Sequence, residues 1–165
     1  MTIAPVGPLS AMVHNLRLMV ADSDAFQVWV GAANAHQAMD RVWAIAAPPV
    51  SLYPWALVEV GDFIRQRTMV FAGSQFEYGA GTHLMLTFRG VADGDEPDAG
   101  YAFMNAIGGV IEDLEAMSGN QASPYQFTIP AISTAAPPQR IISPTRSAAG
   151  DFYEASFIIQ KGVKP

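Results

Sequence analysis

The chain has 165 residues, of which 50% are hydrophobic and only 15% are charged, with 15 acidic residues, 9 basic residues and no cysteine. This length predicts a single domain spanning residues 1–165. The absence of cysteine excludes disulfides, thiolate catalysis and cysteine-ligated metals. The net charge of −6 and the scattered arginines predict no sequence-specific binding of nucleic acid. Ordinary soluble domains carry about 25% charged residues, so the low charge itself needs an explanation.

We expect neither a secretory signal nor a membrane anchor. The first residues contain no basic segment ahead of an apolar run. The longest apolar segment without charge, between Arg41 and Glu59, is interrupted by Pro48, Pro49 and Pro54. A spanning helix needs about 20 consecutive apolar residues. A soluble protein is expected, and the lack of cysteine is consistent with the cytosol.

The N-terminal part of the chain is typical of helices. Apolar residues recur at three- and four-residue spacing over 8–22, which predicts a helix. Asp24 is the expected N-cap of a second, short helix that ends at Gly31, with Gln27 at the capping-box position. Residues 34–40 are polar and form either a short helix or a turn.

Four strands are predicted in the middle of the chain, over residues 41–46, 55–60, 64–71 and 82–91. In the last of them Leu84, Leu86 and Phe88 lie on one face, and the alternate positions lie on the other. Between the last two strands, residues 72–81 contain three glycines and two aromatic residues. This composition favours a mobile or partner-ordered loop over a tight hairpin.

A long helix and two strands are expected to complete the fold. Asp95 or Glu96 caps the helix, Pro97 lies in its first turn, and the apolar period continues to Met117. The Gly108–Gly109 pair indicates that the sheet packs closely there. Alternating residues predict strands over 125–129 and 151–160. The order of elements predicts an α+β fold with a mostly antiparallel sheet and helices packed on one face.

The sequence contains no motif that indicates catalysis or a cofactor. The three histidines, His14, His36 and His83, do not have metal-ligand spacing, and no serine lies in a GxSxG motif. The acidic segment 93–98 fits a helix N-terminus better than a calcium loop, because it lacks the required glycine and the closing glutamate. We therefore predict a protein that is not an enzyme and holds no metal or cofactor.

Three acidic residues lie in the last turns of the long helix, Glu112, Asp113 and Glu115. They form either a solvated face or an acidic surface that meets arginines of a neighbouring subunit.

The chain resembles the tail-completion or tail-terminator proteins of long-tailed bacteriophages in three places. Residues 24–31 (DAFQVWVG) resemble the family's F-Q-x-x-V-G element. Residues 53–60 (YPWALVEV) are similar to its R-P-x-A-x-I strand entry, with Tyr53 where arginine is common. Residues 137–140 (PPQR) followed by 150–157 (GDFYEASF) resemble its P-x-R…F-W-E-A-x-F ending.

The resemblance implies a non-enzymatic α+β virion protein that forms a ring, often hexameric, at the head-proximal end of the tail. The implied partners are copies of itself, the tail tube protein and a head–tail connector or stopper protein, and DNA can pass through the ring. Assembly would occur in the host cytoplasm. Connector proteins and minor tail proteins, which occupy other levels of the neck between head and tail, are alternatives within the same resemblance. The residues expected at interfaces are Arg65, Arg67, Phe76, Glu77, Tyr78, Glu112 and Glu115.

Two alternatives remain open. One is a free-standing α+β domain, enzymatic or small-molecule-binding, whose pocket is lined by Trp29, Trp43 and Trp55. The other is a generic dimerisation module.

Overall fold

The computed structural model describes residues 4, 7–48, 53–61, 65–70, 73–78, 82–92, 95–119, 125, 128–142 and 150–162, and for residues 65–70 and 73–78 the description is of the backbone. The described helices are α1 (Pro8–Asp22), α2 (Asp24–Val30), α3 (Ala35–Met39) and α4 (Asp98–Gly119). The described strands are β1 (Val42–Ala44), β2 (Trp55–Val60), β3 (Arg65–Val70), β4 (Gly73–Tyr78), β5 (His83–Val91), β6 (Ile132–Ile141) and β7 (Phe152–Gln160).

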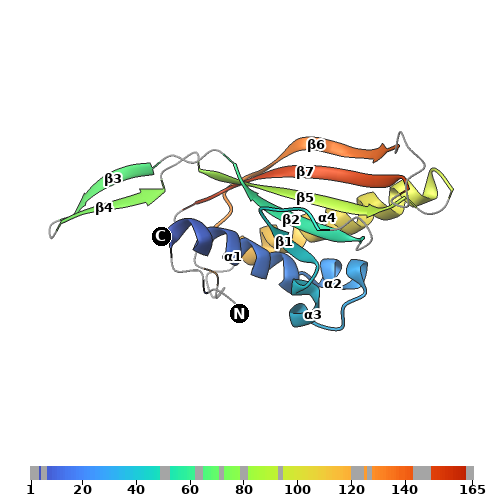
Figure 1. Ribbon diagram of the computed structural model, residues 1–165, viewed down its shortest axis with the longest axis horizontal. Coiled ribbons are helices and arrows are strands. Elements are labelled where there is room, and N and C mark those ends of the chain that lie inside the picture. Colours follow the sequence, from blue (N-terminus) through green and yellow to red (C-terminus); the bar gives the residue numbers. More distant parts are fainter. Residues whose placement is uncertain are drawn as a thin grey trace.

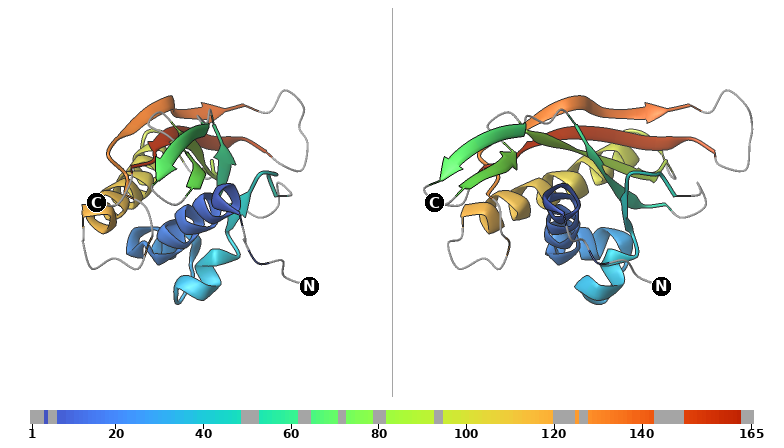
Figure 2. Two further views of the ribbon diagram at one scale, coloured as in Figure 1. Left: turned by 90° about the vertical axis from the view of Figure 1, so that its left-hand side faces the viewer. Right: turned by 60° about the vertical axis from the view of Figure 1, so that its left-hand side comes forward.

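Five strands form the main sheet in the order β1-β2-β5-β7-β6. The β1–β2 pair is parallel and the other three pairs are antiparallel. The four helices lie on one face of this sheet (Figures 1 and 2). The predicted α+β class, with a mostly antiparallel sheet and helices on one face, is confirmed. None of the described helices is both long and apolar enough to cross a membrane.

The core lies between the helices and the sheet. Strand β5 contributes Leu84, Leu86 and Phe88, all at most 1% exposed, which confirms the predicted alternation. Helices α1 and α4 bury their apolar faces against the same layer, and the innermost helical side chains are Leu16, Met19, Val20, Val110 and Leu114. The 3.6-residue pattern of both long helices therefore identified their buried faces.

The glycine-rich segment is not the loop that its composition predicted. Gly73–Tyr78 forms β4, which pairs antiparallel with β3 in a separate two-stranded sheet. In the paired strands, backbone N–H and C=O groups of β3 and β4 form hydrogen bonds with each other. In a loop the same groups would bond to water or to a partner. Positions 72 and 79–81 of the predicted loop lie outside the described residues.

The first strand after α4 also differs from the prediction. Thr128 forms only an isolated bridge with Gly162, and positions 126–127 lie outside the described residues. The strand that pairs with β7 is instead β6, which contains Pro137 and Pro138. Proline is tolerated there because β6 is at the edge of the sheet and its pairing contains two register shifts.

Helix α2 starts one residue earlier than predicted, and helix α4 starts one or two residues later. Ser23, rather than Asp24, is the N-cap of α2, and its hydroxyl accepts the Phe26 N–H at 3.1 Å. Gly31 ends α2 in the left-handed conformation, as predicted. Helix α4 begins at Asp98, so Pro97 precedes the helix instead of lying in its first turn.

Contrary to the prediction, the glycine pair in α4 does not pack against the sheet; only Gly109 makes a close contact, and it does so with helix α2. A Cβ atom on Gly109 would lie 2.9 Å from the Cβ of Ala25 in α2. A Cβ atom on Gly108 would meet nothing within 4 Å among the described residues. Gly109 therefore permits the close α2–α4 contact, while Gly108 has no steric role of this kind.

The two glycines give a matched test of this contact. Gly108→Ala should stabilise the protein by about 1 kcal/mol because alanine favours the helix. Gly109→Ala should destabilise it by roughly 1–3 kcal/mol because the two helices must move apart. Urea denaturation of both variants measures the difference, and equal stabilities would contradict the packing role of Gly109.

Candidate functional site

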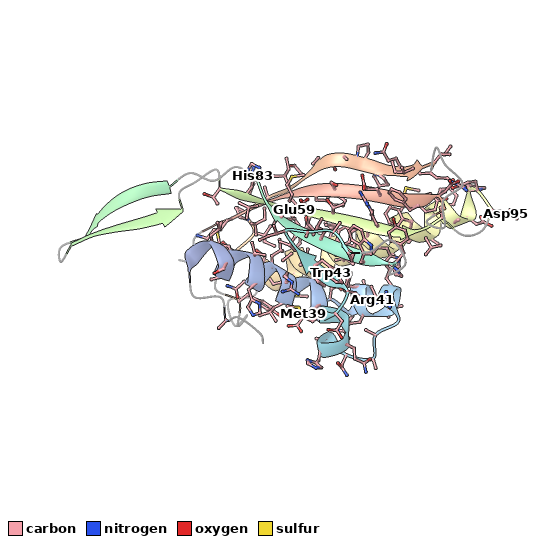
Figure 3. The ribbon with its side chains drawn as sticks, viewed as in Figure 1. Met39, Arg41, Trp43, Glu59, His83 and Asp95 are labelled. Atoms are coloured by element: carbon pink, nitrogen blue, oxygen red, sulfur yellow. The ribbon has the colours of Figure 1, made fainter. Side chains whose placement is uncertain are left out.

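The β3–β4 hairpin extends from the end of the main sheet at which β2 and β5 are connected (Figures 1 and 2). Its base is held by the sheet, because the Gly61 N–H donates to the His83 carbonyl at 3.1 Å and Thr82 is fully buried. His83 marks this end in Figure 3, and Asp95 marks the opposite end. The hairpin is thus an anchored projection of the β2–β5 connection.

The register of the hairpin brings four of the predicted interface residues together. Arg65 lies opposite Tyr78, and Arg67 lies opposite Phe76. Cross-strand partners and positions two residues apart share a face of a sheet. These four residues therefore occupy one face, and Glu77, between Phe76 and Tyr78, occupies the other. One face of the projection combines two arginines with two aromatic residues.

The acidic residues of α4 have two different environments. Glu112 and Glu115 are exposed, as an interface role requires. Asp113 instead accepts the Ser23 hydroxyl at 2.6 Å and the Ala25 N–H at 3.1 Å. Its carboxylate therefore satisfies the N-terminus of α2 from a neighbouring helix. Asp113 is structural, whereas Glu112 and Glu115 are available to a partner.

A cavity of about 390 Å³ lies at the other end of the molecule, between α4 and the edge strand β6. Its lining residues are Glu96, Gly100, Phe103, Met104, Pro138, Gln139, Arg140 and Tyr153. Phe103 and Tyr153 stack with ring centroids 5.4 Å apart. Sequence patterns did not reveal this cavity, because it is formed by segments far apart in the chain.

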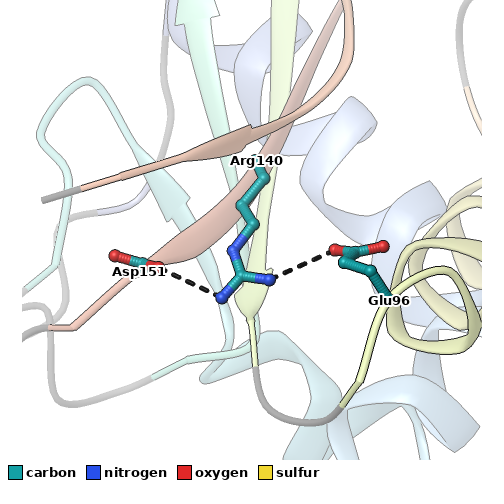
Figure 4. A network of polar contacts seen from close by, with 3 residues as sticks. All are labelled: Glu96, Arg140 and Asp151. Atoms are coloured by element: carbon teal, nitrogen blue, oxygen red, sulfur yellow. Dashed lines mark hydrogen bonds and ion pairs between the residues drawn. The ribbon is translucent and has the colours of Figure 1, made fainter.

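Arg140 connects the two sides of this cavity (Figure 4). One of its terminal nitrogens lies 3.1 Å from a carboxylate oxygen of Asp151, and the other lies 3.4 Å from one of Glu96. All three side chains are partly exposed, so each ion pair contributes little to stability. The network positions the guanidinium at the cavity. No sequence pattern predicted a site at Arg140, which was noted only as part of the P-x-R element of the resemblance.

The face of the sheet away from the helices carries a second polar cluster, centred on Arg89. Its Nε forms an ion pair with Glu154, and its Cζ lies 5.2 Å from the Trp55 ring centroid and 4.7 Å from that of Phe152. Tyr53 stacks on Trp55. The guanidinium of Arg89 thus has its ion-pair and cation–π partners within the same chain. We interpret this cluster as structural.

The three tryptophans do not line one cavity. Trp29 packs edge-to-face on Phe88 on the helix-covered face of the sheet. Trp43 and Trp55 belong to the opposite face, because their neighbours in sequence Val42 and Ala56 point into the core. The pocket proposed for the small-molecule alternative is therefore not formed by these residues.

The described part of the chain contains no group of three or more histidine, aspartate or glutamate residues placed to hold a metal ion.

Burial lowers the pKa of Arg17, whose Nε donates to the Val42 carbonyl at 2.8 Å and joins α1 to β1. This arginine makes a structural contact and does not line the cavity.

No protein-family model matches the chain, and a search of curated proteins also finds no match.

Mutation can separate the structural role of Asp113 from the exposed position of Glu112 and Glu115 in α4. Asp113→Ala should destabilise the protein by about 1–3 kcal/mol, because it leaves the buried Ser23 hydroxyl and the Ala25 N–H without their acceptor. Glu112→Ala and Glu115→Ala are the matched controls and should change stability by less than about 0.5 kcal/mol. Thermal denaturation of the three variants measures this, and equal losses would contradict the assignment.

Proposed function

We propose that the protein is a structural virion protein of a tailed bacteriophage, which forms a ring of identical subunits at the head-proximal end of the tail. The ring, a hexamer in this proposal, completes the tail and joins the tail tube protein to the head–tail connector or stopper protein. It has no catalytic role, and DNA passes through its centre. The subunits assemble in the host cytoplasm and remain in the virion.

The observation that carries this proposal is the projecting hairpin. β3 and β4 pair only with each other in the described sheets. A two-stranded hairpin is at best marginally stable in water and needs a further surface to pack on. The face with Phe76 and Tyr78 offers two aromatic anchors of the kind that dominate protein interfaces. A neighbouring subunit provides such a surface.

The segments that resemble the tail-terminator family correspond to regular elements of the fold. Residues 24–31 comprise α2 and its C-cap, and residues 53–60 lead into and form β2. Residues 137–140 belong to β6, and residues 150–157 lead into β7. The resemblance therefore concerns the helix–sheet body, to which the hairpin is an addition.

The composition also supports an assembly. A chain with 15% charged residues presents less charge to solvent than ordinary soluble domains do. Ring interfaces are heterologous, so each subunit must offer two different surfaces to its neighbours. The hairpin is one of them, and the exposed Glu112 and Glu115 are candidates for contacts with another component.

Removal of the two aromatic residues tests the proposal. The double variant Phe76→Ser, Tyr78→Ser should lose ring formation and incorporation into virions, because the anchors of the interface are gone. Light scattering and negative-stain electron microscopy measure ring formation, and immunogold labelling of purified virions measures incorporation at the neck.

The matched control removes apolar surface elsewhere. Val28 and Ile45 are 82% and 72% exposed, and Val28→Ser, Ile45→Ser should leave assembly unchanged. Intact rings in the hairpin variant would refute the role of the hairpin. A wild-type protein that is absent from virions and stays a monomer with bound metabolites would refute the phage proposal and favour the small-molecule alternative.

A further inference from the structure

The cavity between α4 and β6 has the features of a site built to receive a side chain. Its volume of about 390 Å³ lies at the lower end of the range in which proteins enclose ligands. Phe103 and Tyr153 form a stacked aromatic wall, and Pro138 and Met104 add apolar surface. Met104 is 42% exposed, so part of this apolar lining is open to solvent.

One polar atom of the cavity wall lacks a partner. Tyr153 is only 4% exposed, and its hydroxyl makes no hydrogen bond to any described residue. Burial of an unpaired hydroxyl costs free energy, so such groups usually have a partner in the functional state. Trp43, Tyr53 and Trp55, which do not line the cavity, each carry such an atom as well, so the Tyr153 hydroxyl supports an occupant with a hydrogen-bonding group only together with the shape and charge of the cavity.

The charge around the cavity identifies what kind of occupant fits. Asp95, Glu96 and Asp98 are exposed at the start of α4, and Asp151 lies beside Arg140. Glu96 lines the cavity and, like Asp151, forms an ion pair with Arg140, and among the described residues at this end acidic side chains outnumber basic ones. An occupant that carries positive charge next to an aromatic residue would match both the rim and the wall.

The hairpin of a second copy has this chemistry. One of its faces combines Arg65 and Arg67 with Phe76 and Tyr78. The hairpin and the cavity also lie at opposite ends of the molecule (Figures 1 and 3). A contact between unlike ends of identical chains is heterologous, and such a contact generates a ring when the rotation from one subunit to the next closes.

We propose that the cavity between α4 and β6 binds the β3–β4 hairpin of a neighbouring copy. The hairpin face that carries Phe76 and Tyr78 covers the neighbour's cavity, and the positions of Arg65 and Arg67 on the same face come to lie beside its acidic residues. The Tyr153 hydroxyl then gains a partner in a backbone carbonyl of the incoming hairpin. This inference rests on the proposed ring and names the contact between its subunits.

The absence of cysteine from the chain allows a direct test by cross-linking in trans. Ser74→Cys lies on the aromatic face of the hairpin, and Gln139→Cys lies in the cavity wall. The two variants carry tags of different mass, are mixed, and are treated with a short bismaleimide. We expect the mixed dimer of Ser74→Cys with Gln139→Cys. The exposed Ser133→Cys, on the same edge strand but outside the cavity, is the matched control.

Two further variants test the cavity itself. Met104→Trp fills it from an exposed position, so it should abolish the cross-link and the rings while the subunit stays folded by circular dichroism. Tyr153→Phe should leave the monomer as stable or more stable, because it removes an unpaired hydroxyl, but should weaken association about fivefold. Opposite effects on stability and on association would distinguish a contact residue from a core residue.

The outcomes separate this inference from the proposed function. Rings that form normally with Met104→Trp, or cross-linking equal at Ser133→Cys and Gln139→Cys, would overturn the hairpin–cavity contact and leave the ring proposal standing. Absence of the wild-type protein from virions would refute the ring proposal, whether or not the cross-link forms. Tyr153→Phe without effect on association would overturn the role given to its hydroxyl.

Discussion

The close contact between α2 and α4 is the constraint on which the arrangement of the helix layer depends. Gly109 lets the two helices approach until only a hydrogen atom fits beside Ala25. Asp113, one turn further along α4, holds the N-terminus of α2 through Ser23 and Ala25. A short helix with no partner would be marginal in water, so these contacts stabilise α2 in one position. The position of α2 then determines where Trp29 packs.

Trp29 links the position of α2 to the sheet. Its ring packs against Phe88 of β5 and Phe103 of α4. Gly90 leaves the space for both aromatic rings, since a Cβ there would lie 3.1 Å from Trp29 and 3.0 Å from Phe103. Phe103 in turn stacks on Tyr153 of β7. The same contacts that close the core therefore build the aromatic wall of the cavity.

In the assembly that we propose, the two ends of the molecule have complementary roles. At one end the β2–β5 connection extends into the hairpin, whose two strands pair only with each other in the described sheets. At the other end α4 and the edge strand β6 leave a cavity that their own side chains do not fill. Pro137 and Pro138 in β6 limit edge-to-edge pairing of sheets, because proline lacks the backbone N–H that strand addition needs.

Local patterns in the sequence were sufficient for α1, α4 and β5, because periodic burial is a property of consecutive residues. Arg65, Arg67, Phe76 and Tyr78 were selected from the family resemblance and the composition of segment 72–81, but their common face depends on the pairing of β3 with β4. The edge strand with Pro137 and Pro138, the Gly109–Ala25 contact and the cavity at Tyr153 could not be predicted in this way. Each arises from segments far apart in the chain, and only tertiary packing decides which distant surfaces meet.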